Sequence, residues 1–354
     1  MSPQQRLKAL AVHVIDAEDG AIVKRGCTEL KIGGPGAAEI VRKVLAATSI
    51  GGATSAEICG LFAPSAAPLV RQLIEQLLVR NFLAPVDEAE SEAGEPEGPL
   101  DIFYWHFDAK AAQVAERLNR QSLAILGVNC VSRQLAVSLT ASGVENVRVW
   151  DHPRLRNPRF FDKAGRLNAD QWSASLPSPR EWTNEIDTDS LGCLIASSDF
   201  GGWETLHEWN RFCVQYHKHF LPVVLQDMVG YVGPLVIPGE TACLECVRMR
   251  RNSHAEDHEA RGLIEESAFE GQGAIGFHPS MASILGDIAA LELTKFYSGV
   301  LPSPKVGTLI EVNLLATGLT SRKVLKVPRC PVCSPLLARS SVSPDKTVVA
   351  SAQG

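Results

Sequence analysis

The stretch LAILGVNCVSRQLAVSLTASGVENVRVWD, from Leu123 to Asp151, has the pattern of a strand, a tight turn, a helix and a second strand that ends in an acid. That order is typical of a nucleotide-binding βαβ unit. A dinucleotide-binding turn carries several glycines, so that the backbone can approach the phosphates. Here only Gly127 begins the turn, and Val128 and Val131 add β-branched side chains. The stretch therefore predicts the architecture of a nucleotide-binding domain with a turn that does not suit a triphosphate.

Strand and helix patterns continue to alternate after this unit. GCLIASSD, WETLHEWNRFCVQYHK and FLPVVLQDMV read as strand, helix and strand, and HPSMASILGDIAALELTKFYSG reads as a later helix. Such alternation predicts a mostly parallel sheet covered by helices on both faces. The segment GTLIEVNLLATGLTSRKVLKV reads as paired strands that extend the sheet antiparallel. We therefore predict an α/β, Rossmann-like domain over residues 100–334.

Composition restricts the function classes. The chain has 354 residues and a formal net charge of −6, so no global basic field attracts nucleic acid. No apolar run reaches the roughly 18 residues that span a bilayer, and the N-terminus lacks the apolar segment of a secretory signal. We predict a cytoplasmic protein that binds neither nucleic acid nor membrane.

An acidic segment divides the chain. PVDEAESEAGEPEGP, from Pro85 to Pro99, is rich in proline and glycine and has almost nothing to bury, which is a linker composition. The predicted organisation is a module over residues 1–85, a linker over 86–99 and the α/β domain over 100–334. A small, polar and disordered tail is predicted over 335–354.

The front module combines three strand-like segments, LAVHVID, AIVKRG and CTELKIGG, with three helical ones that end in PLVRQLIEQLLVRNFL. This combination predicts a winged helix. Its third strand and third helix would offer an edge for an extended peptide. The scarcity of basic residues argues against the rival DNA-binding function. The candidate peptide-binding residues are Cys27, Thr28, Glu29, Leu30, Lys31, Ile32, Leu69, Arg71, Gln72, Glu75, Gln76 and Val79.

Two C-x-x-C pairs are the strongest chemical signal. They comprise Cys243 with Cys246 and Cys330 with Cys333. Two such pairs can complete a closed tetrahedral site of four sulfurs, which predicts structural zinc. The alternatives are two unrelated pairs or a redox couple. The other five cysteines are interpreted mainly as buried small residues.

Two acids and two histidines give weaker signals. Asp151 and Asp199 each end a predicted strand, where a carboxylate can bind a ribose hydroxyl or a metal–phosphate. The alternatives are a solvated strand end for Asp151 and a helix N-cap for Asp199. His254 and His258 have the spacing of a metal pair, but a solvated loop is the preferred interpretation of their polar segment.

Taken together, these motifs carry a resemblance. From about Leu123 to Ser334 the chain resembles the ThiF-like, ubiquitin-activating-like adenylation fold, in the opening stretch and in LIASSDFGGWETLHEWNRFC, VGYVGPLVIPGETACLECVRMRR, GDIAALELTKFYSG and VLKVPRCPVC. The front module resembles the recognition element of ribosomally synthesised and post-translationally modified peptide (RiPP) pathways. This RiPP recognition element is a winged helix that binds leader peptides. The combination is similar to two groups. One is the leader-peptide-binding partner proteins of YcaO cyclodehydratases, and the other is the microcin C type of adenylating enzyme.

The turn decides between these groups. Active members carry a G-x-G-G-x-G loop, where this chain has GVNCVS, and brace the phosphates with an Asn and an Arg, which Asn157 and Arg159 match only loosely. Asp199 matches the magnesium-binding acid. The resemblance thus implies a vestigial nucleotide site without catalytic residues and with no use of ATP or magnesium by this chain. The site residues are Gly127, Asn129, Asp151, Asn157 and Asp199.

The resemblance therefore implies a scaffold. The front module would bind the leader of a ribosomal precursor peptide by strand addition, and the second domain would dock a YcaO-type cyclodehydratase that forms the backbone heterocycles. The resemblance also implies a homodimer. The alternative function is an ATP-dependent enzyme that adenylates a peptide C-terminus.

Overall fold

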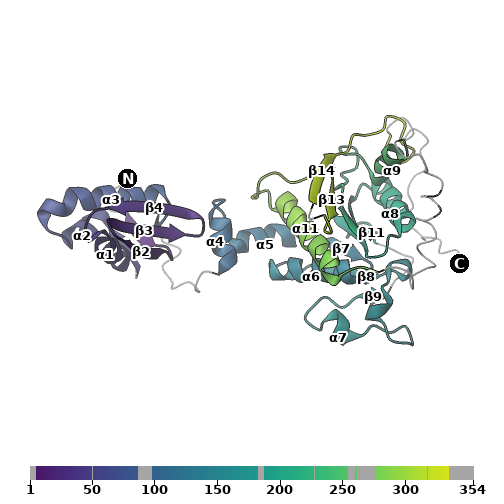
Figure 1. Ribbon diagram of the computed structural model, residues 1–354, viewed down its shortest axis with the longest axis horizontal. Helices are drawn as coiled ribbons and strands as arrows, with labels where there is room; N and C mark the ends of the chain where they lie inside the picture. The colour runs from purple at the N-terminus through teal and green to yellow at the C-terminus, as the bar shows by residue number, and fades with distance from the viewer. Residues whose placement is uncertain are drawn as a thin grey trace. The chain divides into compact units, whose positions relative to one another are not determined.

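The computed structural model describes residues 5–49, 51–86, 98–181, 187–226, 228–253, 260, 263, 276–316 and 318–334. Most of the predicted linker, the predicted tail, His254 and His258 lie outside these residues. The chain divides into two compact units, Met1–Lys110 and Ala111–Gly354. Each unit is described separately (Figure 1).

The described residues of unit 1 form two small antiparallel sheets and four α-helices. One sheet has the order β5-β1-β6, from strands Ala53–Thr54, Arg6–Ala9 and Leu83–Pro85. The other has the order β2-β3-β4, from strands His13–Ala17, Gly20–Arg25 and Thr28–Gly33. The helices are α1 (Ala37–Ser49), α2 (Ser55–Gly60), α3 (Ala67–Val79) and α4 (Pro99–Trp105), and a 3-10 turn η1 spans Pro64–Ala66.

The core of unit 1 forms where the apolar sides of these elements meet. Leu7 of β1, Val41 of α1 and Ile74 of α3 are buried together in it. Thr54 and Glu57 form a capping box at the start of α2, in which each bonds the other's backbone N–H. This reciprocal pair satisfies two donors that a helix start would otherwise leave open.

Unit 2 is built on an eight-stranded sheet with the order β14-β13-β12-β11-β10-β7-β8-β9. The pairs from β9 to β11 are parallel, and those from β11 to β14 are antiparallel. This confirms the predicted mixed α/β domain with a mostly parallel sheet and an antiparallel extension. The strands are β7 (Leu123–Leu126), β8 (Val147–Asp151), β9 (Arg180–Glu181), β10 (Cys193–Ser198), β11 (His219–Gln226), β12 (Val229–Val232), β13 (Thr308–Asn313) and β14 (Gly318–Lys323).

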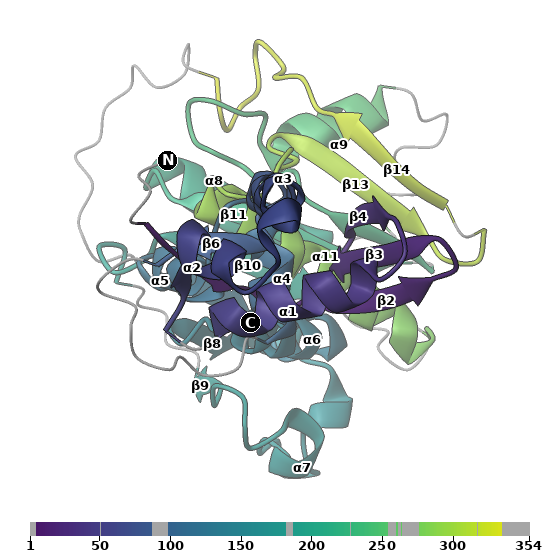
Figure 2. The same ribbon diagram turned by 90° about the vertical axis from the view of Figure 1, so that its left-hand side faces the viewer.

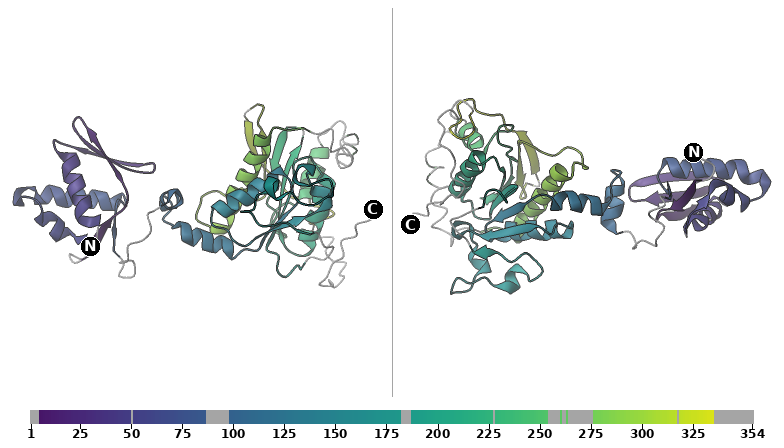
Figure 3. Two further views of the ribbon diagram at one scale, coloured as in Figure 1. Left: turned by 90° about the horizontal axis from the view of Figure 1, so that it is seen from below. Right: turned by 180° about the vertical axis from the view of Figure 1, so that it is seen from behind.

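Helices cover both faces of this sheet (Figures 1 and 3). One face carries α6 (Cys130–Ala141) and α11 (Pro279–Ser298), which pack on each other. The other carries α8 (Trp203–Gln215) and α9 (Leu244–Asn252). The other helices among the described residues of unit 2 are α5 (Ala111–Asn119), α7 (Ala169–Trp172), η3 (Pro153–Leu155) and η4 (Pro158–Phe160). Every helix among the described residues is too short or too polar to cross a bilayer.

The close packing of α11 on α6 depends on Gly286. A Cβ at this position would lie 2.7 Å from the backbone nitrogen of Leu135 and 3.0 Å from the carbonyl oxygen of Val131. Glycine therefore lets the two helix backbones approach each other. This contact fixes α6, the helix that begins at the predicted nucleotide turn.

Candidate functional site

The turn between β7 and α6 is tight. Gly127 has a φ of +107°, and a Cβ there would lie 2.8 Å from the carbonyl oxygen of Ser197 and 2.9 Å from the Nδ2 of Asn129. Only glycine fits this backbone and this space. Asn129 is fully buried, and its Nδ2 donates to the carbonyl oxygens of Ser197 (2.8 Å) and Leu155 (3.2 Å). The turn is held by the protein's own polar groups.

The N-terminus of α6 is capped by side chains. The N–H of Cys130 donates to Asp199 Oδ2 at 2.8 Å, and the N–H of Ser132 donates to Asn129 Oδ1 at 3.0 Å. The Oγ of Ser132 accepts the N–H of Asn129 at 2.9 Å. Free N–H groups at a helix N-terminus are what a nucleotide-binding fold offers to phosphate. Here the N–H groups of Cys130 and Ser132 are already bonded to the chain itself.

Asp199 is the acid that caps α6. It is 1% exposed, and its Oδ2 also accepts the Nδ2 of Asn157 at 2.8 Å. Its Oδ1 is buried and accepts no hydrogen bond from the nitrogen and oxygen donors of the part of the chain that the structure describes. Burial raises the pKa of this carboxyl. The alternative in which Asp199 caps the helix near Trp203 is wrong, because the N-cap of α8 is Gly202 and no side chain caps this helix start.

Asp151 forms an ion pair instead of capping a helix. Its two carboxylate oxygens accept the Nε and an Nη of Arg156 at 2.7 and 2.8 Å. Arg156 also lies over the ring of Phe161, 4.8 Å from its centroid. Asp151 is 8% exposed, so it is not a solvated strand end. The sequence contains Arg156 five residues after Asp151, but spacing alone did not identify the pair.

The structure therefore brings four of the five residues of the predicted vestigial nucleotide site together around the start of α6. Gly127, Asn129, Asn157 and Asp199 meet there, while Asp151 lies at the end of β8 with Arg156. Arg159 contributes its backbone N–H to the Oδ1 of Asn157 at 3.0 Å. The Arg156 pair and the inward position of Asn129 are the features that sequence reasoning missed.

Replacing Asp199 by asparagine should stabilise unit 2 near neutral pH. The folded-state pKa of Asp199 is raised, so the ionised form costs stability, and this cost grows as pH rises from about 4 through the folded pKa. Asparagine keeps an oxygen for the N–H of Cys130 and removes the buried charge, a gain of roughly 1 kcal/mol. Urea unfolding at a mildly acidic and a mildly alkaline pH should show the larger gain at the higher pH. A gain that shrinks as pH rises would contradict this assignment.

Four sulfurs lie together at the edge of unit 2. Cys243 precedes α9, Cys246 lies in its first turn, and Cys330 and Cys333 follow β14. All four Sγ atoms lie within 4.8 Å of one another, with contacts of 3.9, 3.6 and 3.4 Å. Sulfurs around a tetrahedral zinc stand about 3.8 Å apart, whereas disulfide sulfurs are about 2 Å apart. The cluster fits a metal ion.

A backbone donor favours a thiolate at Cys246. The backbone N–H of Val327 donates to the Sγ of Cys246 at 3.4 Å. Hydrogen bonds from neighbouring thiols, that of Cys243 first, lower the pKa of Cys246, and the same contacts raise the pKa of Cys243. With four sulfur ligands a zinc ion would have no open position, so it would be structural. It would tie α9 to the segment after β14.

In unit 1, β4 is an edge strand. Among the described residues β4 pairs with β3 alone, and Figures 1 and 2 show β4 and α3 in the same unit. Leu30 and Ile32 face the core, whereas Glu29 and Lys31 are exposed. On α3, Leu69 and Val79 are 70% and 75% exposed. The remaining candidates on this helix are also exposed, namely Arg71, Gln72, Glu75 and Gln76.

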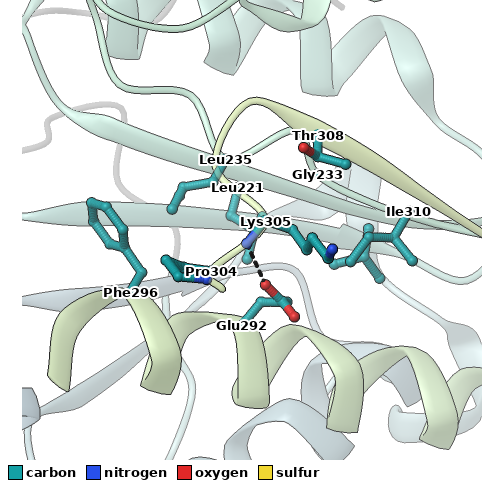
Figure 4. Close-up of a pocket in the computed structure, with 10 residues that line it drawn as sticks. Leu221, Gly233, Leu235, Glu292, Phe296, Pro304, Lys305, Thr308 and Ile310 are labelled. Atoms are coloured by element: carbon teal, nitrogen blue, oxygen red, sulfur yellow. Dashed lines mark hydrogen bonds between the residues drawn. The ribbon is translucent and has the colours of Figure 1, made fainter. Parts of the chain in front are cut away.

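A shallow hollow in unit 2 has a different character (Figure 4). Its lining is mainly apolar and includes Leu221, Phe296 and Ile310. The one carboxylate in its lining, Glu292, accepts the backbone N–H of Lys305 and the Nζ of Lys295, both at 2.8 Å. Both carboxylate oxygens of Glu292 are therefore engaged by the protein itself.

No family model matches the chain. Protein HesA of Leptolyngbya boryana is 28% identical over 217 residues, which cover 60% of this chain and 70% of HesA. Among solved structures, Escherichia coli MccB with ATP has a TM-score of 0.60 at 16% identity, covering 93% of this chain and 100% of MccB. MccB in complex with N-formylated MccA has a TM-score of 0.62 at 16% identity.

The heterocyclase TruD has a TM-score of 0.57 at 17% identity. Its match covers 93% of this chain, but the chain spans only 43% of the TruD length. At these identities the likeness concerns the fold. The chain is therefore similar in fold to the microcin C7 biosynthetic enzyme MccB over the whole length of MccB, and to less than half of the heterocyclase TruD.

Proposed function

We propose that this protein is a leader-peptide-binding scaffold in the biosynthesis of a ribosomally made, post-translationally modified peptide, and that it does not use ATP itself. It holds a precursor peptide and presents it to a YcaO-type cyclodehydratase. The observation that carries the proposal is the self-capped start of α6, where Asp199 and Asn129 take the N–H groups of Cys130 and Ser132.

The geometry of this turn supports the loss of ATP binding in two ways. A phosphate would have to displace a buried carboxylate from the helix N-terminus, and it would then face a like charge. The turn also carries Val128 and Val131, both fully buried, in place of the glycines that admit a pyrophosphate. In this proposal Gly127, Asn129, Asp151, Asn157 and Asp199 form a vestigial site.

Unit 1 would serve as the RiPP recognition element, a winged-helix module. The unpaired edge of β4 and the exposed side of α3 support strand addition of an extended leader, with the exposed ones among the twelve candidate residues as the contact surface, since Leu30 and Ile32 face the core. The exposed Leu69 and Val79 are suited to apolar leader side chains, because covering them with a peptide would remove apolar surface from water.

The remaining parts of the proposal concern the partners. TruD is described as a heterocyclase, and its extra length is consistent with a catalytic part that a separate YcaO-type protein would supply here. Binding the leader would raise the effective concentration of the precursor at that enzyme. We also propose zinc in the cysteine cluster, a homodimer and a cytoplasmic location.

The second candidate function is adenylation of a peptide C-terminus with ATP and magnesium. The full-length likeness to MccB favours it, since MccB was solved with ATP. The self-capped helix argues against it.

ATP–pyrophosphate exchange separates the two functions. The purified, zinc-containing chain should show no exchange above background, with or without candidate precursor peptides, and titration with Mg·ATP should give no binding tighter than about 1 mM. The physical reason is the occupied helix N-terminus. Peptide-dependent exchange at a useful rate would replace the scaffold by the adenylating enzyme.

A further inference from the structure

Helix α4 reaches the turn between β3 and β4. The N–H of Cys27 in this turn donates to the Nε2 of His106, the residue that follows α4, at 3.3 Å. Gly26 has a φ of +56°, and a Cβ there would lie 2.3 Å from the same Nε2. His106 therefore packs directly on Gly26 and Cys27, the two residues that precede β4.

A second contact fixes the same end of the sheet. Arg25, the last residue of β3, is 2% exposed and donates to the carbonyl oxygen of Ala11 at 2.8 Å. Its guanidinium lies over the ring of Trp105, 4.8 Å from the centroid. The Trp105 ring stacks on Phe82 at 6.4 Å and 17°, against the core of unit 1. An arginine held between a carbonyl and an aromatic face is a rigid support.

We infer that α4 is a positioning element of the peptide-docking edge. It holds the Gly26–Cys27 turn and so fixes where β4 begins and how its edge is presented. Only residues 106–110 separate α4 from α5, the first helix of unit 2. The helix that positions the docking edge is therefore joined to unit 2 by five residues of chain. The part of the inference that concerns peptide rests on the proposed function.

The test compares Trp105→Ala with Phe103→Ala in the full chain. Phe103 lies on the same helix but is 41% exposed, and its ring contacts are to Tyr104 and Phe107. Backbone amide exchange by NMR or mass spectrometry, without any peptide, is the first readout. Trp105→Ala should speed exchange at Cys27 and along β4 by about tenfold or more, whereas Phe103→Ala should stay within about twofold of the parent.

Peptide affinity is the second readout. The probes are overlapping synthetic peptides that tile the precursor-like reading frames beside the gene. Trp105→Ala should weaken the best-binding peptide by about tenfold. If Trp105→Ala leaves amide exchange at Cys27 unchanged, the inference is overturned. If it speeds exchange but leaves the peptide affinity unchanged, α4 has only a structural role, and the inference is overturned as well. If no peptide binds the parent, the proposed function fails, while the exchange experiment still decides whether α4 positions the edge.

If Trp105→Ala fails to fold, His106→Ala and Gly26→Ala test the same inference. His106→Ala removes the acceptor of the Cys27 N–H, and His106 is not part of the buried core cluster. It should give the same faster exchange at Cys27. Gly26→Ala should lower the melting temperature less in the His106→Ala background than in the parent, because the 2.3 Å clash is then absent. Equal losses in both backgrounds would show that the His106 contact does not form.

Discussion

Replacing Cys246 by alanine will remove the metal from unit 2 and destabilise it by several kcal/mol, on the order of 4. The parent should purify with one zinc per chain, measured by plasma mass spectrometry, and the variant with almost none. The reason is geometric. Three of the Sγ contacts in the cluster are 3.9, 3.6 and 3.4 Å, close to the roughly 3.8 Å that separates the sulfurs around a tetrahedral zinc ion.

The matched control is Cys213→Ala. Cys213 is as buried as Cys246 and belongs to the same core, but it is not one of the four clustered cysteines. Its loss should cost about 1 kcal/mol and leave the zinc content unchanged. Equal stability of the two variants, or a parent that purifies without metal under metal-replete expression, would contradict a structural zinc site.

The sequence predicts the cysteine cluster well because the chemistry is local. Each C-x-x-C pair brings two sulfurs together within one turn, whatever the rest of the chain does. The sequence could not show that the pairs would meet, which depends on α9 packing beside the end of the antiparallel extension. That packing is set by long-range burial around Cys243 and Cys330.

The parallel sheet was predictable for a related reason. The strand of Leu123–Leu126 is buried on both faces, so it reads as a continuous apolar run. The interpretation of Asp199 illustrates the limit. An acid after a strand can bind a metal, cap the next helix or cap a distant one, and the choice depends on the position of Cys130, 69 residues away in the chain.

The contacts of α4 could not be predicted from the sequence either. The segment after the acidic linker gives no signal that Trp105 will stack on Phe82 or lie over Arg25. Periodicity describes what one element buries, and it does not name the partner. Long-range aromatic contacts of this kind are therefore found only from the structure.

Replacing Lys31 by proline should abolish most peptide binding while leaving unit 1 folded. In the β3–β4 hairpin, Arg25 and Thr28 flank a two-residue turn, and the N–H of Gly34 bonds the carbonyl oxygen of Asp19 at 2.8 Å. Hydrogen-bonded pairs alternate along an antiparallel ladder. The N–H groups of Thr28, Leu30 and Ile32 therefore face β3, and those of Glu29 and Lys31 face the open edge.

Proline at position 31 removes an outward donor and places its ring where an added strand would approach. One lost backbone hydrogen bond and the steric conflict together should weaken the best tiled peptide by at least about tenfold. Lys31→Ala is the control, because it deletes the exposed side chain and keeps the N–H, and it should bind within about threefold of the parent. Proline at Leu30 would be a poor test, since that N–H bonds β3 and its loss would damage the sheet. If Lys31→Pro and Lys31→Ala bind the peptide equally well, the leader does not add to β4, and the docking surface must lie elsewhere on unit 1.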